Sequence, residues 1–385
     1  MVQTMVNSVR RAPVGHTVNK PMHISELQTP ALLIDLDIME RNLARTASYA
    51  REHGFRLRPH TKTHKIPALA RRQLERGAVG VTVAKVSEAE VMLRAEPPDL
   101  LIAYPVLGRR KLERLAAVTR QTRVTVALDS EEAARQLSEA ASAASLEFGV
   151  LVEADVGLGR MGVQPGRELV DLAAQVARLP DLALRGIAFY PGHIKALDEG
   201  GLKAIDELAG LVAGIVDDFK AAGLPCDIVS GGSTPALFHS HRVTGMNEIR
   251  PGTYIFNDRN TVACGGCGLE DCAASILVTV VSTAHRDRLI VDGGSKTFSS
   301  DRLVTTGEAT FGVVTGAPEA RFVKMNEEHG FIDLPGASGR FRVGDTLRII
   351  PNHICVAMNL HEQVYAVCGE EVLEVWRVEG RGKLQ

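Results

Sequence analysis

The 385-residue chain has almost no net charge, because 44 lysine and arginine residues nearly balance 46 aspartate and glutamate residues. A nucleic-acid-binding surface needs a concentrated basic face, so we do not expect nucleic acid as a partner. No apolar run reaches the roughly 18–20 residues that a membrane-spanning helix needs, so no membrane association is expected. Residues 1–25 also lack the continuous apolar core of a secretory signal, and we predict a flexible N-terminal tail there.

Cysteine is scarce, and the six cysteines of a chain this long do not make a disulfide scaffold. Such usage is typical of the cytoplasm, where thiols stay reduced. Three of the six, Cys264, Cys267 and Cys272, cluster in the sequence CGGCGLEDC. The cluster has two interpretations, an additional metal or redox site and a glycine-rich loop with free thiols. We favour the loop, because no further metal ligand lies nearby at a suitable spacing.

Strand and helix patterns alternate over the first part of the sequence, with apolar residues at helical spacing in segments such as 38–53 and 201–222. Repeated strand–helix units imply parallel strands with right-handed crossovers. A closed (β/α)8 barrel fits these units better than an open sheet, because no GxGxxG follows the first strand. The predicted strands are Ala31–Asp37, Phe55–His60, Ala78–Ala84, Asp99–Pro105, Arg123–Asp129, Glu147–Asp155, Leu182–Tyr190 and Cys226–Gly232.

The pattern changes after Asp258, where short strand candidates are separated by glycine-rich turns and by no long amphipathic helix. This is typical of a separate β domain. We therefore predict an α/β protein with a barrel over residues 26–258 and a C-terminal β domain over residues 259–385, to which the tail is added. The strands predicted for the β domain are Val278–Val281, Leu289–Asp292, Thr346–Ile350, Gln363–Val367 and Val372–Val378.

Polar residues follow several predicted barrel strands, at the end where barrel enzymes keep their functional groups. A lysine, an arginine, a tyrosine and a small-residue loop on one rim are what a phosphate-bearing aldehyde cofactor requires. Lys62 has cationic neighbours that favour loss of its proton. The alternatives are a basic surface loop and an ordinary glycine-rich turn, whereas the lack of GxxxxGK argues against a nucleotide P-loop. The segments are RPHTKTHK at 58–65, GLGRMG at 157–162, YPGH at 190–193 and SGGSTP at 230–235.

A second candidate site lies in the sequence PNHIC at 351–355. In a strand, residues two apart point to the same face, so His353 and Cys355 can reach one metal ion. Imidazole and thiolate suit zinc, and two protein ligands leave open positions, as in a catalytic site. The alternative is a buried cysteine beside a hydrogen-bonded histidine. The sequence HEQVY at 361–365 lacks the second histidine of HExxH, which argues against a metalloprotease.

The segment RPHTKTHK resembles the cofactor-lysine motif of the metal-dependent D-threonine aldolase and D-serine dehydratase family. The resemblance extends from Thr29 to the C terminus and implies an alanine-racemase-like fold, in which a barrel that binds pyridoxal 5′-phosphate (PLP) is followed by a β domain. Further similar motifs are TPALLID (Thr29–Asp35), VTVAKVSEAE (Val81–Glu90), LLIAYP (Leu100–Pro105), GLGRMGV (Gly157–Val163), SGGSTP (Ser230–Pro235), EIRPGTYIFND (Glu248–Asp258), NEEHG (Asn326–Gly330) and PNHIC (Pro351–Cys355).

The resemblance implies roles for individual residues. Lys62, the first lysine of the motif, would carry PLP covalently. Arg160 would face the cofactor's phenolic oxygen, and Tyr190 would lie close to its ring. His353 and Cys355 would bind a divalent metal near the substrate's β-hydroxyl, with Zn²⁺ favoured over Mn²⁺. The cofactor phosphate would be held by Gly232, Ser233, Thr234, Gly252 and Tyr254.

Three further residues have matches in the family or its fold. Arg250 stands where alanine racemases have an arginine near the pyridine nitrogen. His193 and His64 are candidate auxiliary bases. Of these two, His193 is predicted to be catalytic together with Lys62. Family members commonly pair so that the β domain of one chain closes the barrel mouth of the other, which implies a homodimer.

The metal motif divides the family. The aldolase branch commonly shows His-x-Asp-Pro-Thr, whereas the pair at 353 and 355 is closer to the His-x-Cys of the D-serine and 3-hydroxyaspartate dehydratases. The resemblance therefore implies a lyase for D-3-hydroxy amino acids, first of all a D-serine or D-threonine dehydratase that yields a 2-keto acid and ammonia. The alternative is a D-threonine aldolase that yields glycine and an aldehyde. The metal pair counts against an amino-acid racemase, and the β domain counts against a non-catalytic PLP-binding protein.

Overall fold

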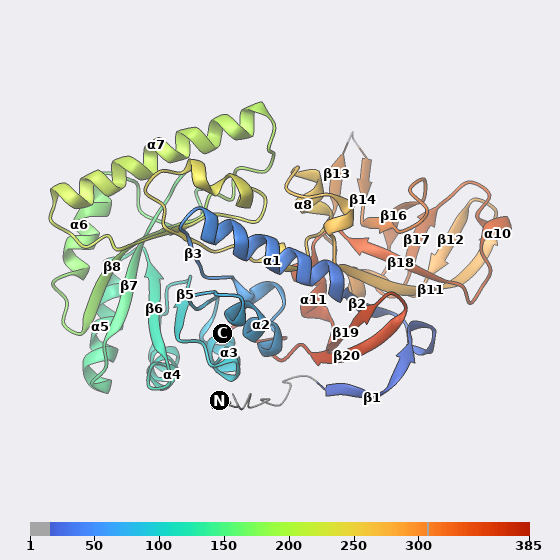
Figure 1. The fold of residues 1–385 in the computed structure, drawn as a ribbon, viewed down its shortest axis with the longest axis horizontal. Coiled ribbons are helices and arrows are strands. Elements are labelled where there is room, and N and C mark those ends of the chain that lie inside the picture. Colours follow the sequence, from blue (N-terminus) through green and yellow to red (C-terminus); the bar gives the residue numbers. More distant parts are fainter. Residues whose placement is uncertain (1–15, 306–307) are drawn as a thin grey trace, which may run out of the picture.

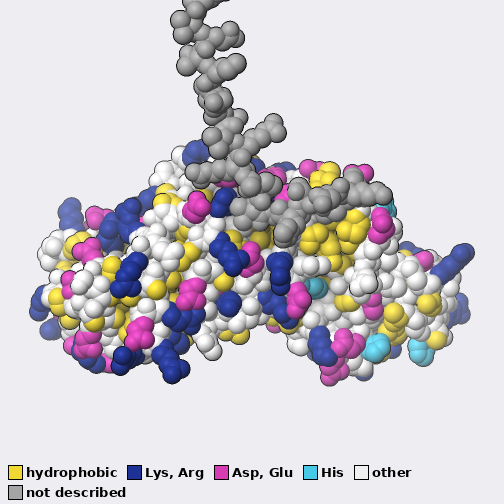
Figure 2. All heavy atoms as spheres, turned by 90° about the horizontal axis from the view of Figure 1, so that it is seen from below, with side chains coloured by type: hydrophobic (Ala, Val, Ile, Leu, Met, Phe, Trp, Pro, Cys, Tyr) yellow, Lys and Arg dark blue, Asp and Glu magenta, His cyan; other side chains and the backbone are white. Residues whose placement is uncertain are grey.

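The computed structural model describes residues 16–305 and 308–385. They form two large sheets side by side, a parallel one surrounded by helices and a mostly antiparallel one (Figure 1). Within these residues every helix is too short or too polar to cross a lipid bilayer. Basic and acidic side chains are interspersed over the face shown in Figure 2, in keeping with the balanced charge of the sequence.

The parallel sheet is the barrel that the sequence predicts. Within the described residues, eight strands follow the order β3-β10-β9-β8-β7-β6-β5-β4. The ring closes between its ends, because the Val79 amide donates to the Leu57 carbonyl at 2.9 Å and the Thr82 amide donates to the Pro59 carbonyl at 2.8 Å. The strands are β3 (Arg56–Leu57), β4 (Val81–Val83), β5 (Asp99–Ile102), β6 (Arg123–Leu128), β7 (Phe148–Ala154), β8 (Leu182–Phe189), β9 (Ile228–Gly231) and β10 (Glu248–Ile249).

Helices connect the barrel strands and bury one face each. In α7 the buried residues are Ile205, Leu208, Val212, Ile215 and Phe219, the spacing that places side chains on one side of a helix. Both helices predicted by this spacing are confirmed, as α1 (Leu36–Glu52) and α7 (Glu199–Ala221). The others are α2 (Pro67–Glu75), α3 (Val86–Met92), α4 (Arg109–Thr119), α5 (Glu131–Ala144) and α6 (Arg167–Val176).

One predicted barrel strand belongs to the other sheet. The segment predicted as Ala31–Asp37 forms β2 (Ala31–Asp35), but β2 pairs with β11 and β19. The eighth barrel strand is instead β10, which has two residues and was not predicted. An entirely buried apolar run does not indicate which sheet it joins, and a two-residue strand is too short for any periodicity. The assignment of the first barrel strand was therefore wrong.

The second sheet has ten strands in the order β1-β20-β19-β2-β11-β12-β17-β16-β15-β18, and β11 also pairs with β18. This extra pairing closes the strands from β11 to β18 into a small barrel. The strands are β1 (His16–His23), β11 (Ala274–His285), β12 (Arg288–Val291), β15 (Gly312–Val314), β16 (Arg321–Met325), β17 (Gly330–Asp333), β18 (Thr346–Pro351), β19 (Gln363–Cys368) and β20 (Glu371–Arg377), besides β2. A separate pair, β13 (Leu303–Thr305) with β14 (Glu308–Thr310), and the helices α8 (Arg259–Ala263), α9 (Ser295–Phe298), α10 (Ala337–Arg340) and α11 (Ile354–Leu360) complete this part.

The predicted N-terminal tail is structured where it is described. Residues 16–23 form β1, which pairs antiparallel with β20, whereas residues 1–15 lie outside the described residues. The prediction of a flexible tail was therefore wrong for residues 16–23, because a strand that pairs along one edge needs no apolar run of its own.

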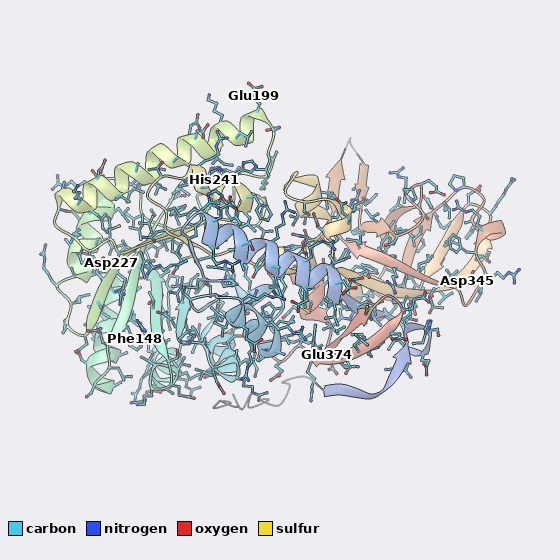
Figure 3. The ribbon with its side chains drawn as sticks, viewed as in Figure 1. Phe148, Glu199, Asp227, His241, Asp345 and Glu374 are labelled. Carbon is cyan, nitrogen blue, oxygen red and sulfur yellow. The ribbon has the colours of Figure 1, made fainter. Side chains whose placement is uncertain are left out.

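Ion pairs connect the barrel helices to the second sheet. Arg72 of α2 contacts Glu40 of α1 at 2.7 Å and Glu374 of β20 at 2.6 Å. Trp376 donates its indole N–H to the same Glu374 at 2.8 Å, and Figure 3 shows Glu374 on the barrel side of β20. Because Arg72 is partly buried and bonded to both elements, it fixes the second sheet beside the barrel.

Candidate active site

A cavity of about 620 Å³ lies at the carboxyl ends of the barrel strands and reaches α11 of the second part. Its lining comes from the segments that follow β3, β4, β5, β7, β8, β9 and β10, so residues far apart in the sequence meet there. Of the residues predicted from the sequence, those that line it are Lys62, Arg160, Tyr190, Gly232, Ser233, Thr234, Arg250, Gly252, His353 and Cys355.

Lys62 is the lysine of the RPHTKTHK segment that is available for chemistry. It lies in the short 3-10 turn Thr61–Thr63, and its amide donates to Nδ1 of His60 at 3.4 Å. Lys65 is buried, pairs with Glu88 at 3.2 Å and donates to Asn359 at 2.9 Å. Among the described residues Lys62 has no such acidic partner. The two lysines therefore differ in their surroundings: Lys65 is paired inside the protein, whereas Lys62 lines the cavity.

The surroundings of Lys62 favour its neutral form. Its side chain has exposed surface, but it lines the cavity and is enclosed by protein groups around it. Burial lowers the pKa of Lys62, and the positive charges of Arg160 and Arg250 lower it further, against the opposing charge of Cys355. A neutral amine is the form that attacks an aldehyde, so this environment fits a lysine that reacts with one.

Tyr190 lies between the lysine and an arginine. The Nζ atom of Lys62 is 6.0 Å from the centroid of its ring, and the Cζ atom of Arg160 is 4.9 Å from it. Burial raises the pKa of Tyr190, so it stays a neutral phenol. Gly192 has to be glycine, because a Cβ atom there would lie 2.4 Å from Cε1 of the tyrosine ring. The segment YPGH thus forms the part of the cavity wall beside Lys62 and Arg160.

Arg160 is placed by the loop that follows β7. The Val163 amide donates to the Glu153 carbonyl at 2.8 Å, and the Asp155 amide donates to the Val163 carbonyl at 2.9 Å, so the loop folds back on its strand. Gly162 has φ +106° and its Cβ would lie 2.4 Å from the Asp155 nitrogen, so only glycine fits. The spacing of GLGRMG therefore turns Arg160 toward the cavity.

Backbone amides without acceptors gather at one end of the cavity. Within the described part of the chain, the N–H groups of Gly232, Ser233, Thr234 and Gly252 donate to no protein group, and all four residues line the cavity. Gly252 allows the close approach, because a Cβ atom there would lie 2.9 Å from Oγ1 of Thr63. Unpaired amides in a turn are a common anion-binding arrangement, so the donor set fits a phosphate group.

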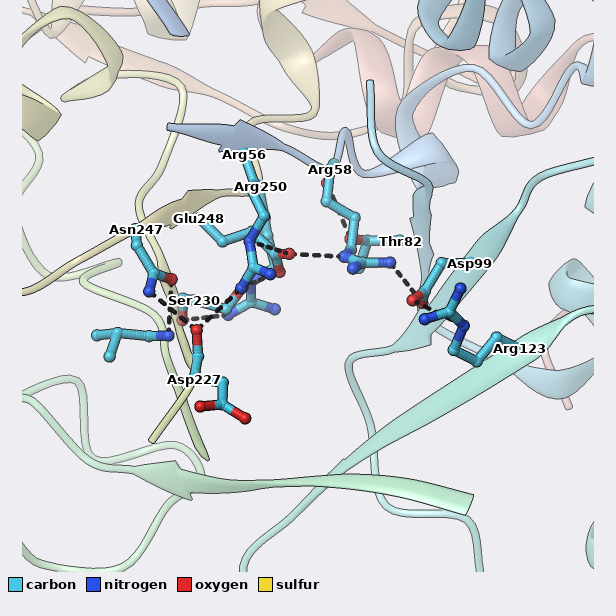
Figure 4. A network of polar contacts seen from close by, with 11 residues as sticks. Arg56, Arg58, Thr82, Asp99, Arg123, Asp227, Ser230, Asn247, Glu248 and Arg250 are labelled. Carbon is cyan, nitrogen blue, oxygen red and sulfur yellow. Dashed lines mark hydrogen bonds and ion pairs between the residues drawn. The ribbon is translucent and has the colours of Figure 1, made fainter. Parts of the chain in front are cut away.

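Arg250 borders the cavity above a buried polar network (Figure 4). Its Nη2 donates to the Phe189 carbonyl at 2.9 Å, whereas its buried Nε finds no partner in the described residues. Glu248, two residues earlier, contacts Nε of Arg58 at 3.0 Å and accepts from Ser230 Oγ at 2.7 Å. The network continues to Asp99, which is 2.7 Å from Nη1 of Arg58, and from there to Nε of Arg123 at 3.8 Å.

His353 and Cys355 lie together, although by a different local structure from the predicted one. They follow β18, where His353 precedes α11 and Cys355 is in its first turn, so the prediction of a strand was wrong. Asp258 positions the turn, because its carboxylate accepts the Ile354 amide at 3.1 Å. The Nδ1 atom of His353 lies 2.9 Å from Asp301 Oδ2. A carboxylate behind an imidazole is the usual way of orienting a metal ligand.

The thiol of Cys355 is prepared for a cation. Burial opposes its ionisation, but the hydrogen bond and charge of His353 together lower the pKa of Cys355 below its ordinary value. Thr63 Oγ1 lies 3.3 Å and Thr253 Oγ1 lies 3.5 Å from its sulfur. No group of three or more His, Cys, Asp or Glu that could hold a metal occurs among the described residues. The imidazole and the thiolate therefore fit a metal with positions left open for other ligands.

Two family models match the chain, the "alanine racemase, N-terminal domain" over residues 34–260 and the "putative serine dehydratase domain" over residues 273–367. A 3-hydroxy-D-aspartate aldolase of Paracoccus denitrificans is 34% identical over 94% of this chain and 94% of its own. The chain belongs to this family of PLP-dependent D-amino-acid lyases. The crystal structure of D-threonine aldolase from Filomicrobium marinum has a TM-score of 0.89 and 33% identity, over 97% of this chain and 100% of that one.

A dehydratase of the family is similar too. A D-threo-3-hydroxyaspartate dehydratase, solved as a cysteine-to-alanine mutant in the metal-free form, has a TM-score of 0.84 and 32% identity, over 92% of this chain and 98% of that one. The lyase therefore resembles relatives with two different reactions to a similar extent.

Three predicted residues of the lyase do not line the cavity. Tyr254 is buried with its hydroxyl on Gln73 at 3.0 Å, and only its amide turns to the site, where it donates to Thr234 Oγ1 at 3.3 Å. His64 is buried as well, with its ring on Gln73 at 3.3 Å and on the Ile66 amide at 3.0 Å.

His193 is exposed, and its ring lies against Gly157 of the loop after β7. Its predicted catalytic role stays a prediction. The sequence had also left several lining residues without a role, among them His60, Tyr104, Glu153 and Thr253. Glu153 could have been found, because it ends a predicted strand in the same way as the residues that were chosen.

The cysteine cluster lies apart from this cavity. Cys264, Cys267 and Cys272 occupy the turns between α8 and β11, and all six cysteines are free thiols. The thiol of Cys272 is buried and faces Cys267, and both this contact and burial raise its pKa. A thiol with a raised pKa is a poor nucleophile and a poor metal ligand.

Proposed function

We propose that this lyase is a PLP- and divalent-metal-dependent dehydratase that converts a D-3-hydroxy amino acid, D-serine or D-threonine, into a 2-keto acid and ammonia. The observation that carries the proposal is that Lys62 and the pair of His353 and Cys355 line one cavity. Dehydration removes a proton from the α-carbon and releases the β-hydroxyl. A base and a set of metal ligands within reach of one small molecule are what this reaction requires.

PLP would be held by groups that otherwise lack partners. Lys62 would carry it covalently, and the free amides of Gly232, Ser233, Thr234 and Gly252 would hold its phosphate. When bound, the cofactor supplies an electron sink for negative charge at the α-carbon. Arg160 and Tyr190 would border its phenolic oxygen and its ring. Tyr254 would contribute through its amide, which fixes the hydroxyl of Thr234.

The metal would be held by His353 and Cys355, with Asp301 behind the imidazole. Imidazole and thiolate favour Zn²⁺ over Mn²⁺, which prefers oxygen ligands. A divalent ion there supplies a Lewis acid for the departing hydroxyl. Support comes from the similar dehydratase, whose cysteine-to-alanine mutant was solved in a form described as metal-free.

Lys62 is the base that supports dehydration rather than aldol cleavage. Its amine, when not bonded to the cofactor, would take the α-proton, and burial, which lowers its pKa, favours the neutral form that this step needs. Aldol cleavage instead needs a base at the β-hydroxyl. The two histidines considered for such a role, His64 and His193, do not line the described cavity.

Aldol cleavage is the second candidate. It is favoured by the TM-score of 0.89 with a D-threonine aldolase and by 34% identity with a 3-hydroxy-D-aspartate aldolase. Both reactions use the same cofactor lysine and the same metal pair, so these anchors do not separate them. The His-x-Cys pair is the feature that leads us to place dehydration first.

We also infer a cytoplasmic homodimer. Tyr104 lines the cavity yet is 42% exposed, and Val356, beside the metal pair, is 39% exposed. Large apolar side chains exposed at the mouth of a cavity are typical of a surface that another chain covers. The free thiols of all six cysteines support a reducing compartment.

Product analysis tests the proposal. The purified protein, loaded with PLP and Zn²⁺, is incubated with D-serine, D-threonine or D-3-hydroxyaspartate, with and without a chelator. A chelator-sensitive release of 2-keto acid and ammonia is the expected result. Glycine and an aldehyde would establish the aldolase instead, and the absence of both products with all three substrates would refute a lyase for this substrate class.

A further inference from the structure

One ionisable side chain of the cavity has no part in the proposed chemistry. Glu153 is the last residue but one of β7, near the rim where barrel enzymes keep their functional groups, and it is only 6% exposed. Among the described residues it is the one carboxylate that lines the cavity, where the other charged groups are Lys62, Arg160 and Arg250, with His353 and Cys355 at the metal end. A single carboxylate thus lies in one cavity with two arginines and a lysine.

The carboxylate of Glu153 makes no hydrogen bond and no ion pair within the described residues. A buried carboxylate in that state is costly, so native structures keep one only where something offsets the cost. Part of the offset comes from the two guanidinium groups. Burial raises the pKa of Glu153 above its ordinary value, and the charges of Arg250 and Arg160 counteract part of this rise. In return, Glu153 is the first of the carboxylates that support the charge of Arg250.

The backbone holds these three charges in a fixed arrangement. The carbonyl of Glu153 accepts the Val163 amide at 2.8 Å, which ties the loop carrying Arg160 to the same strand residue. Arg250 is fixed from the other side, by its amide on the Gly231 carbonyl at 3.0 Å and its Nη2 on the Phe189 carbonyl at 2.9 Å. The carboxylate therefore faces two arginines that come from different strands.

We propose that Glu153 is a positioning residue, whose negative charge sets the guanidinium groups of Arg160 and Arg250 against the ring of the bound cofactor. The proposal rests on the proposed function, because it concerns the same cavity. The proposal predicts opposite effects on anion binding and on turnover, because Glu153 contributes negative charge to the cavity. Removing the carboxylate makes the cavity more cationic, so anions such as PLP and inorganic phosphate bind at least as tightly, while the arginines lose their orientation and turnover falls.

The experiment compares Glu153→Gln with wild type, with Glu153→Asp as the conservative variant. Glu147→Gln is the matched control, because Glu147 is exposed beside the opposite end of the same strand. We expect Glu153→Gln to lower kcat roughly tenfold, the change in rate that about 1.4 kcal/mol of lost interaction between charges produces in the transition state. Its PLP dissociation constant should be unchanged or smaller, and the visible absorbance maximum of the bound cofactor should move. Glu153→Asp should recover part of both kcat and the wild-type maximum.

Two outcomes would overturn the role of Glu153. One is a kcat and an absorbance maximum that match those of Glu147→Gln. The other is a joint loss of kcat and of PLP affinity, which indicates a residue needed only for folding. A wild-type protein that binds PLP but gives no product with any D-3-hydroxy amino acid is a different result. It would reject the proposed function, while the shift of the absorbance maximum in Glu153→Gln would still test the charge arrangement.

Discussion

The buried ion pair beneath the cavity allows a quantitative prediction. Glu248 is fully buried, 3.0 Å from Nε of Arg58 and 2.7 Å from Oγ of Ser230. Breaking a buried pair from one side costs about 3–5 kcal/mol, because the remaining charge stays buried. Arg58 keeps a contact with Asp99 at 2.7 Å, so we place Glu248→Gln at the lower end, with a loss of about 3 kcal/mol.

Unfolding in urea, followed by circular dichroism, measures this loss. Asp206→Asn is the matched control, because it breaks a bidentate ion pair with Arg242 whose side chains are 56% and 35% exposed. Exposed pairs contribute about 1 kcal/mol or less, so the control should change the free energy of unfolding little. If Glu248→Gln costs no more than Asp206→Asn, the network does not stabilise the barrel in the way argued here.

Two further predictions concern the cavity. Cys355→Ala should lose bound metal and activity together and keep the visible absorbance of PLP, whereas Cys368→Ala, at an exposed thiol, should keep all three. Bound metal is measured by atomic absorption, and metal at full stoichiometry in Cys355→Ala would place the site elsewhere. The rate at which the apo-protein takes up PLP should rise with pH and level off below the ordinary lysine pKa of 10.5, because burial and the two arginines lower the pKa of Lys62 and the neutral amine is the reactive form. A rate that still rises at pH 10.5 would show that this pKa is not lowered.

Much of the fold could be predicted, because the barrel helices bury one face each and most barrel strands are long enough to be recognised by their apolar pattern. The failures have physical causes. The first four residues of β2 are apolar and buried and carry no sign of the sheet that the strand joins, and β10 has only two residues. The strand β1 is recognised by its pairing with β20 and not by its own pattern.

The cavity could be predicted in part. Motifs located Lys62, Arg160 and the small-residue turn, because each follows a strand and the strands of a barrel end on one rim. Side-chain direction was not predictable in this way, since His64 and Tyr254 turn into the protein and pair with Gln73. The interaction of Glu153 with Arg160 and Arg250 could not be predicted, because only the folded strands bring these charges near one another.

The central claim is that Lys62 carries the cofactor, and one measurement tests it directly. The PLP-loaded protein is reduced with borohydride, which makes the bond between lysine and cofactor permanent, and its peptides are mapped by mass spectrometry. The account predicts the phosphopyridoxyl group on Lys62 and none on Lys65, whose amine is occupied by Glu88 and Asn359. The group on Lys65, or on a lysine outside the cavity, would contradict the account.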